Sequence, residues 1–126
     1  MIVGIGVDVV QIDRIRRSLT RFGERFAKKI LAPAEIELFS RAQDPAAWLA
    51  KRFAAKEAAA KALGTGMRAG VYFSQIAVTR KPSGAPVLTL GGAAAARAES
   101  MGITGLHASI SDEAGVAVAF VVMDAP

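Results

Sequence analysis

The sequence predicts an α+β fold, and three observations support this prediction. Helical periodicity dominates the first half of the chain, whereas strand-like alternation dominates the second half. Hydrophobic residues make up 52% and charged residues 21% of the chain, which is typical of a globular protein. A length of 126 residues suits one domain, so we expect residues 1–126 to form a single folding unit.

The first half is predicted to open on a strand whose apolar side chains share one face, while Asp8 shares the other face with Gly4 and Gly6. Helices follow, and the longest is rich in alanine and ends at Gly64, a predicted C-terminal cap. In order, we expect a strand over residues 2–10, helical turns over 12–30 with a break at Gly23, a short helix from Pro33, and a helix over 45–63.

The second half is predicted to consist mainly of strands. The expected elements are strands over 71–79 and 86–90, a helix over 93–101, and a final hairpin of 105–111 and 116–123. The last strand is almost wholly apolar, so we expect it to be central and covered on both faces.

Charge and cysteine content narrow the function. The formal net charge of +5 indicates an acidic partner, such as nucleic acid, a phosphorylated small molecule or an acidic protein. The chain has no cysteine, and Asp8 interrupts the only early apolar run, so we expect a cytoplasmic protein without a membrane span.

Asp8 stands within an apolar strand, where an ionised carboxylate needs a partner, a hydrogen bond or a metal ion. A strand-end aspartate that caps the next helix is the alternative. In the long helix, Phe53, Glu57 and Lys61 follow one stripe. Glu57 and Lys61 fit either an exposed helix ion pair or a site where a carboxylate binds Mg²⁺ beside a lysine that contacts phosphate.

His107, the only histidine, alternates with Ser109 and Ser111 and so faces the same way as they do. A lone histidine is more often structural than catalytic, and no G-x-S-x-G elbow supports a serine hydrolase. The glycine-rich segment Gly64-Thr65-Gly66 follows a helix, where it either caps that helix or offers backbone N–H groups to a phosphate.

Three segments together resemble the holo-acyl-carrier-protein synthase family, the small single-domain type within the 4′-phosphopantetheinyl transferase superfamily. These segments are Gly4-Ile5-Gly6-Val7-Asp8, residues 52–66 from Arg52 to Gly66, and His107-Ala108-Ser109-Ile110-Ser111. The resemblance implies magnesium-dependent transfer of 4′-phosphopantetheine from coenzyme A to a serine of apo acyl carrier protein. Adenosine 3′,5′-bisphosphate is the other product, and the reaction belongs to fatty acid biosynthesis.

The resemblance also implies roles for individual residues. Asp8 and Glu57 match magnesium ligands, and Lys61 matches a lysine that contacts phosphate. The general base stays open between Glu57 and a metal-bound water. The resemblance also implies which residues contact coenzyme A. These are Arg52, Phe53, Lys61, Gly64, Thr65, Gly66, His107 and Ser109. Val10 stands where larger relatives carry a third acidic ligand, and Gln11 stands where small relatives often have glutamate.

Two further expectations concern partners. The resemblance implies a homotrimer with active sites between subunits, because larger relatives resemble two such lobes fused. Arg14, Arg17 and Arg21 recur at helical spacing, so we expect them to dock the acidic carrier protein on a face away from the metal site. A basic RNA-binding module is the alternative function, but one Trp and one Tyr provide few stacking side chains, so we expect no nucleic-acid partner.

Overall fold

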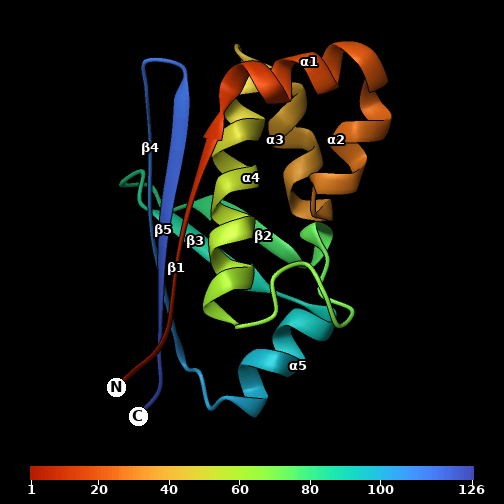
Figure 1. Cartoon of the computed structure of the whole chain (residues 1–126). Coiled ribbons are helices and arrows are strands. Elements are labelled where there is room, and N and C mark those ends of the chain that lie inside the picture. Colours follow the sequence, from red (N-terminus) through yellow and green to blue (C-terminus); the bar gives the residue numbers. More distant parts are fainter.

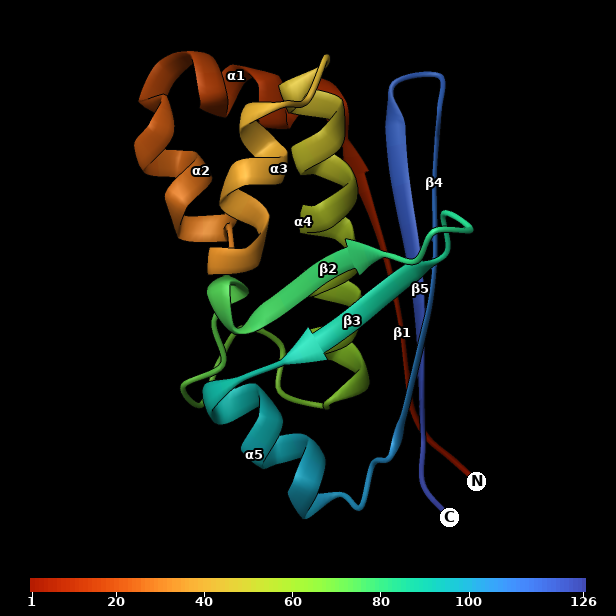
Figure 2. The same cartoon turned by 180° about the vertical axis from the view of Figure 1, so that it is seen from behind.

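Helix α4 (Pro45–Ala62) is the axis around which the other elements pack. A three-stranded sheet lies along one side of it, and a two-stranded sheet crosses behind it in the view of Figure 1 and contacts the larger sheet (Figure 1 and Figure 2). The computed structural model describes residues 1–126. The elements are β1 (Ile2–Gln11), α1 (Ile12–Phe22), α2 (Glu24–Ile30), η1 (Pro33–Glu35), α3 (Ile36–Ser40), α4 (Pro45–Ala62), η2 (Phe73–Gln75), β2 (Ile76–Arg80), β3 (Pro86–Leu90), α5 (Gly92–Ser100), β4 (Gly105–Glu113) and β5 (Val116–Asp124). The predicted α+β class is confirmed.

Both sheets are antiparallel. In the larger sheet the strand order is β1-β5-β4, and in the smaller sheet β2 pairs with β3. Helices α1, α2 and α3 gather at one end of α4, while α5 lies near the opposite end, which is also the end of the molecule that carries both termini (Figure 1). Strand β5 lies between β1 and β4, so the predicted central position of the last strand is correct.

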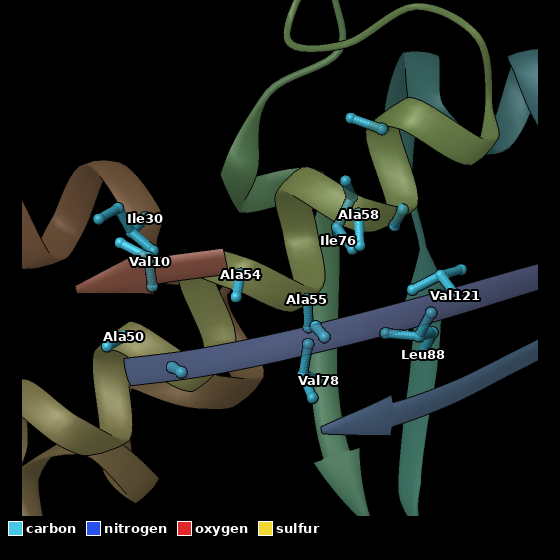
Figure 3. Close-up of a cluster of buried hydrophobic side chains, with 14 of the residues drawn as sticks. Val10, Ile30, Ala50, Ala54, Ala55, Ala58, Ile76, Val78, Leu88 and Val121 are labelled. Carbon is cyan, nitrogen blue, oxygen red and sulfur yellow. The ribbon is translucent and has the colours of Figure 1, made fainter. Parts of the chain in front are cut away.

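Small residues allow β1 and α4 to approach closely. A Cβ atom at Gly4 would lie 2.1 Å from the backbone oxygen of Ala62, and one at Gly6 would lie 1.9 Å from that of Ala58. The glycine face of β1 therefore packs against the helix, and Asp8 lies on that same face. Figure 3 shows the alanines of α4 packed among strand residues such as Ile76, Val78 and Val121. The core depends on close backbone approach as well as on large side chains.

A buried ion pair anchors α4 to the segments beside it. The Nζ atom of Lys56 donates hydrogen bonds to Glu35 Oε1 and to the carbonyl oxygens of Ile30 and Phe73. Glu35 also accepts from the backbone N–H groups of Ala32 and Val78. Burial lowers the pKa of Lys56, and the charge of Glu35 opposes that decrease. Nothing in the sequence analysis singled out this pair.

Two details differ from the sequence prediction. Strand β2 begins at Ile76, because a 3₁₀ turn occupies Phe73–Gln75 where a strand from residue 71 was expected. The last strand is covered on one face only within this chain, since Phe120 is 46% exposed. No helix is both long and apolar enough to cross a membrane.

Candidate active site

The site forms where β1 passes α4, and its first pair joins Lys61 to Asp8. Lys61 Nζ donates a hydrogen bond to the carbonyl oxygen of Val7 at 2.9 Å and lies 3.3 Å from Asp8 Oδ1. The Lys61 side chain is 51% exposed and that of Asp8 is 18% exposed. Asp8 and Lys61, predicted as site residues from separate segments, therefore meet at an accessible surface.

Glu57 lies one helical turn before Lys61 and is coupled to the same pair. Burial raises the pKa of Glu57, and the negative charge of Asp8 raises it further, while Lys61 and Arg14 act in the opposite direction. The i, i+4 ion pair between Glu57 and Lys61, which was one of the two interpretations of this spacing, does not form, because Lys61 pairs with Asp8 instead. Two carboxylates that repel each other are thus held beside one ammonium group.

This donor set fits Mg²⁺ only in part. The chain holds no group of three or more His, Cys, Asp or Glu side chains that could bind a metal ion. Magnesium is, however, commonly held by one or two carboxylates together with water and substrate phosphates. The raised pKa of Glu57 indicates carboxylates that a cation would stabilise. Asp8 and Glu57 therefore suit a magnesium ion whose remaining ligands come from elsewhere.

Phe53 and Arg14 border the carboxylates. The Arg14 guanidinium carbon lies 5.7 Å from the centre of the Phe53 ring, and that ring stacks on Phe73 at 5.1 Å. Arg14 also influences the pKa of Glu57. The expectation that all three helix α1 arginines lie away from the site is therefore wrong for Arg14, because α1 packs directly on α4.

Arg17 and Arg21 lie on another part of α1. With Asp13, Arg16 and Thr20 they line an open depression of about 400 Å³. Arg16 forms an ion pair with Asp44 at 3.3 Å, which leaves Arg17 and Arg21 as the exposed arginines of this depression without an ion pair. Docking of a carrier protein on these two arginines stays a prediction.

Arg52 is buried on a different side of α4. Its guanidinium carbon lies 3.8 Å from the centre of the Trp48 ring, and its Nε has no hydrogen-bond partner. Burial lowers the pKa of Arg52 to about 10, and the charge of Arg80 lowers it further. Two and a half turns of about 3.6 residues separate Arg52 from Lys61, so the two side chains project from opposite sides of the helix.

The glycine-rich segment caps α4. The backbone N–H groups of Thr65 and Gly66 both bond to the carbonyl oxygen of Ala60, and that of Gly64 bonds to Lys61. Gly64 has a φ of 78°, which favours glycine. These N–H groups are already used by the helix end, so the suggestion that they bind phosphate is not supported by their hydrogen bonds. Their surface can still contact a ligand.

His107 and Ser109 lie on the outer face of the larger sheet, turned away from α4. Both are exposed, whereas Leu106, Ala108 and Ile110 are partly buried, as the predicted alternation requires. His107 Nε2 lies 2.7 Å from Asp124 Oδ2. The sequence analysis missed Asp124, because a partner two residues along on a neighbouring strand becomes visible only once the β4–β5 register is known.

Comparisons with known proteins identify the family to which this chain belongs. The profile of the 4′-phosphopantetheinyl transferase superfamily matches residues 4–121. A holo-[acyl-carrier-protein] synthase of Maridesulfovibrio salexigens is 53% identical over 124 residues, which cover 98% of this chain and 99% of the relative. The crystal structure of the Neisseria meningitidis holo-[acyl-carrier-protein] synthase superposes with a TM-score of 0.92 at 45% identity, covering 98% of this chain and 99% of that one.

The Helicobacter pylori holo-[acyl-carrier-protein] synthase, solved in complex with coenzyme A, has a TM-score of 0.82 at 37% identity and covers 95% of this chain and 99% of its own. The chain therefore belongs to the 4′-phosphopantetheinyl transferase superfamily. Within it, these similar proteins are all holo-[acyl-carrier-protein] synthases, so the resemblance predicted from the sequence is confirmed. None of them supports the RNA-binding alternative.

Proposed function

We propose that this protein transfers 4′-phosphopantetheine from coenzyme A to a serine of apo acyl carrier protein in a magnesium-dependent reaction. The observation that carries the proposal is the meeting of Asp8, Glu57 and Lys61 at one accessible surface, in a chain similar to a protein solved with coenzyme A. Adenosine 3′,5′-bisphosphate leaves when the serine oxygen replaces the pyrophosphate bridge oxygen on the transferred phosphorus.

Each residue has a distinct task in this proposal. Asp8 and Glu57 hold the ion, which when bound would neutralise phosphate charge and align the phosphates. Lys61 donates to a phosphate oxygen, and the carboxylate of Glu57 stands ready to accept the serine proton. Phe53, under Arg14, supplies an apolar wall beside these groups. No covalent intermediate with the protein is needed.

The residues proposed to bind coenzyme A point in several directions within one chain. Lys61 and Arg52 leave α4 on opposite sides, and His107 and Ser109 face outward from the sheet. The unpartnered guanidinium of Arg52 near Arg80 suits a phosphate oxygen as an acceptor. A single coenzyme A molecule would reach all of these groups only if different subunits supplied them.

The outer face of the larger sheet supports the proposed homotrimer. Ile5, Val7 and Val9 of β1 are each more than half exposed, and they stand opposite Val122, Phe120 and Val118 of β5 in the register. A contiguous apolar face of this kind marks an association surface. We propose that three copies cover it and complete the active sites between them. Phe120→Glu should give a folded monomer with little activity, as judged by light scattering and circular dichroism.

Mixed assemblies test whether the sites are shared. Asp8→Ala and His107→Ala should each be inactive alone, because one loses the metal-binding side and the other the outer-face side. Refolding them together should restore activity, since some interfaces would pair an intact Asp8 with an intact His107. A mixture as inactive as its components, although gel filtration shows mixed assemblies, would contradict the shared site.

The acidic carrier is proposed to dock on α1, where Arg17 and Arg21 line the depression described above. Opposite charges favour fast association at low salt. The decisive assay for the function mixes the protein, Mg²⁺, coenzyme A and an apo acyl carrier protein, and follows the carrier by mass spectrometry. A phosphopantetheine adduct is expected. No adduct with several folded carriers, or full activity in EDTA, would refute the transfer or its magnesium dependence respectively.

A further inference from the structure

Lys61 forms an ion pair with Asp8, which is one of the two carboxylates proposed to hold the metal ion. Its ammonium group lies 3.3 Å from Asp8 Oδ1 and donates to the neighbouring Val7 carbonyl at 2.9 Å. The lysine is the more exposed member of the pair, at 51% against 18% for Asp8. The ammonium group of Lys61 thus lies beside Asp8 at a surface that solvent, and therefore an ion, can reach.

A divalent ion and an ammonium group repel each other at this distance. Coulomb interaction between charges about 4 Å apart is substantial even in the polarisable surroundings of a protein surface. A free ion must therefore either bind beside Lys61 or displace it from Asp8. Both routes lower the affinity of the carboxylate pair for the ion alone.

Phosphate changes this balance because it gives the ammonium group a second anion to bind. An ammonium group has three donors, and Lys61 uses two of them on Val7 and Asp8. Lys56, five residues earlier, is fixed by three acceptors and is fully buried, but Lys61 has an exposed side chain that can turn. A phosphate arriving with its own metal ion would draw Lys61 from Asp8 while delivering the ion to it.

We infer that Lys61 makes the Asp8–Glu57 pair selective for a divalent cation already bound to phosphate and weakens its binding of the free ion. This inference rests on the proposed function. It adds a role to Lys61 that precedes the chemical step: the lysine couples binding of the metal to binding of the pyrophosphate. Coupling of this kind is reciprocal, so the metal must also favour pyrophosphate binding by the same factor.

The test measures metal binding without turnover. Mn²⁺ is titrated into the protein and free Mn²⁺ is followed by electron paramagnetic resonance, first alone and then with coenzyme A, with no carrier protein present. Wild type is compared with Lys61→Met. The matched control is Lys51→Met, which removes one positive charge from the same helix but from a lysine paired with Asp112 at 3.6 Å. Asp8→Asn reports whether Mn²⁺ binds at the proposed carboxylates.

We expect Lys61→Met to bind Mn²⁺ alone about tenfold more tightly than wild type, because a like charge close to the ion has been removed. The tightening produced by coenzyme A should shrink by a similar factor, while Lys51→Met should resemble wild type. Equal or weaker Mn²⁺ binding by Lys61→Met, with Asp8→Asn still weakened, would overturn the inference and leave the metal site standing. Unchanged binding by Asp8→Asn would overturn the metal site, and this inference with it.

Discussion

Two lysines of α4, Lys56 and Lys61, lie five residues apart, and each pairs with a carboxylate from another segment. The two pairs differ in burial and in hydrogen bonding, which separate a structural pair from a functional one. Lys56 and Glu35 are both 0% exposed. Lys61 and Asp8 are 51% and 18% exposed. Both lysines have the same chemistry and the same helix, so their surroundings alone decide what each can do.

Hydrogen-bond capacity makes the difference concrete. All three donors of Lys56 are used, and Glu35 accepts from two backbone N–H groups in addition to the lysine. Nothing remains with which to bind a ligand. Lys61 keeps one donor and a path to solvent. Helix α4 thus carries a lysine that serves stability, Lys56, which we call the stability stripe, and a set that serves activity, Phe53, Glu57 and Lys61, which we call the activity stripe. The following predictions test that division.

The largest effect is expected on the activity stripe. Asp8→Ala and Glu57→Ala should each lower the transfer rate at limiting Mg²⁺ by about a thousandfold or more, since either loss removes a ligand of an ion worth several kcal/mol to the transition state. Both variants should stay folded by circular dichroism. Near-normal turnover by either variant would remove that residue from the metal site.

The stability stripe should respond in the opposite way. Lys56→Met should lower the free energy of unfolding by about 3–5 kcal/mol, because Glu35 would be left buried without its counter-ion. Lys61→Met should change it by less than about 1 kcal/mol, since exposed ion pairs contribute little, while turnover falls steeply. Urea denaturation and kinetics on the same preparations provide both quantities. A large stability loss for Lys61→Met with unchanged turnover would reverse the division.

A smaller effect concerns the pH dependence of stability. The pKa of Glu57 is raised above its ordinary 4.5, so the folded state holds this proton more tightly than the unfolded state does. The stability contributed by the protonated side chain is fully present below pH 4.5 and is lost as the pH rises through the raised pKa. Glu57→Gln should therefore be more stable than wild type at neutral pH, and the difference should vanish in acid.

Urea denaturation in EDTA from pH 4 to pH 7.5, roughly spanning the window in which an interacting carboxyl titrates, measures this difference. Glu99→Gln, at an exposed position on α5, is the matched control for the replacement of a glutamate by glutamine. A Glu57→Gln difference that does not vary with pH would mean that burial beside Asp8 does not disfavour the charge.

The sequence was most informative where local pattern and chemistry coincide. The order of helices and strands followed from periodicity, and the odd placement of Asp8 in an apolar strand marked the site. The stripe of Phe53, Glu57 and Lys61 also followed from helical spacing, because spacing fixes which side chains share a face.

The sequence pattern could not predict which side chains pair when they lie far apart along the chain. Glu35 and Asp124 were not assigned their partners, since Lys56 and His107 meet them only through packing and strand register. Helical spacing offered Lys61 only its neighbour Glu57 as a possible ion-pair partner, whereas the close approach of β1 at Gly4 and Gly6 brings Asp8 within reach instead. Arg14 was grouped with Arg17 and Arg21 for the same reason, since spacing cannot show which part of α1 packs on α4.

That regrouping of the arginines leads to the smallest expected effect. Arg17→Glu with Arg21→Glu should raise the KM for the acidic carrier about three- to tenfold at low salt, because rim charges act mainly on association. The KM for coenzyme A should stay unchanged. Arg14→Glu should lower kcat as well, since Arg14 lies over Phe53 and acts on Glu57.

Arg41→Glu provides a charge-matched control for each single reversal, because Arg41 is exposed on the segment after α3, where it pairs with Glu37. Wild-type kcat/KM should fall as ionic strength rises, and the doubly reversed variant should respond less or in the opposite direction, because screening weakens attraction and repulsion alike. Should the double reversal leave both the carrier KM and its salt dependence unchanged, the carrier does not dock on this part of α1. Arg17 and Arg21 would then belong to a solvated face of α1, and the roles proposed for Glu57 and Lys61 on α4 would be unaffected.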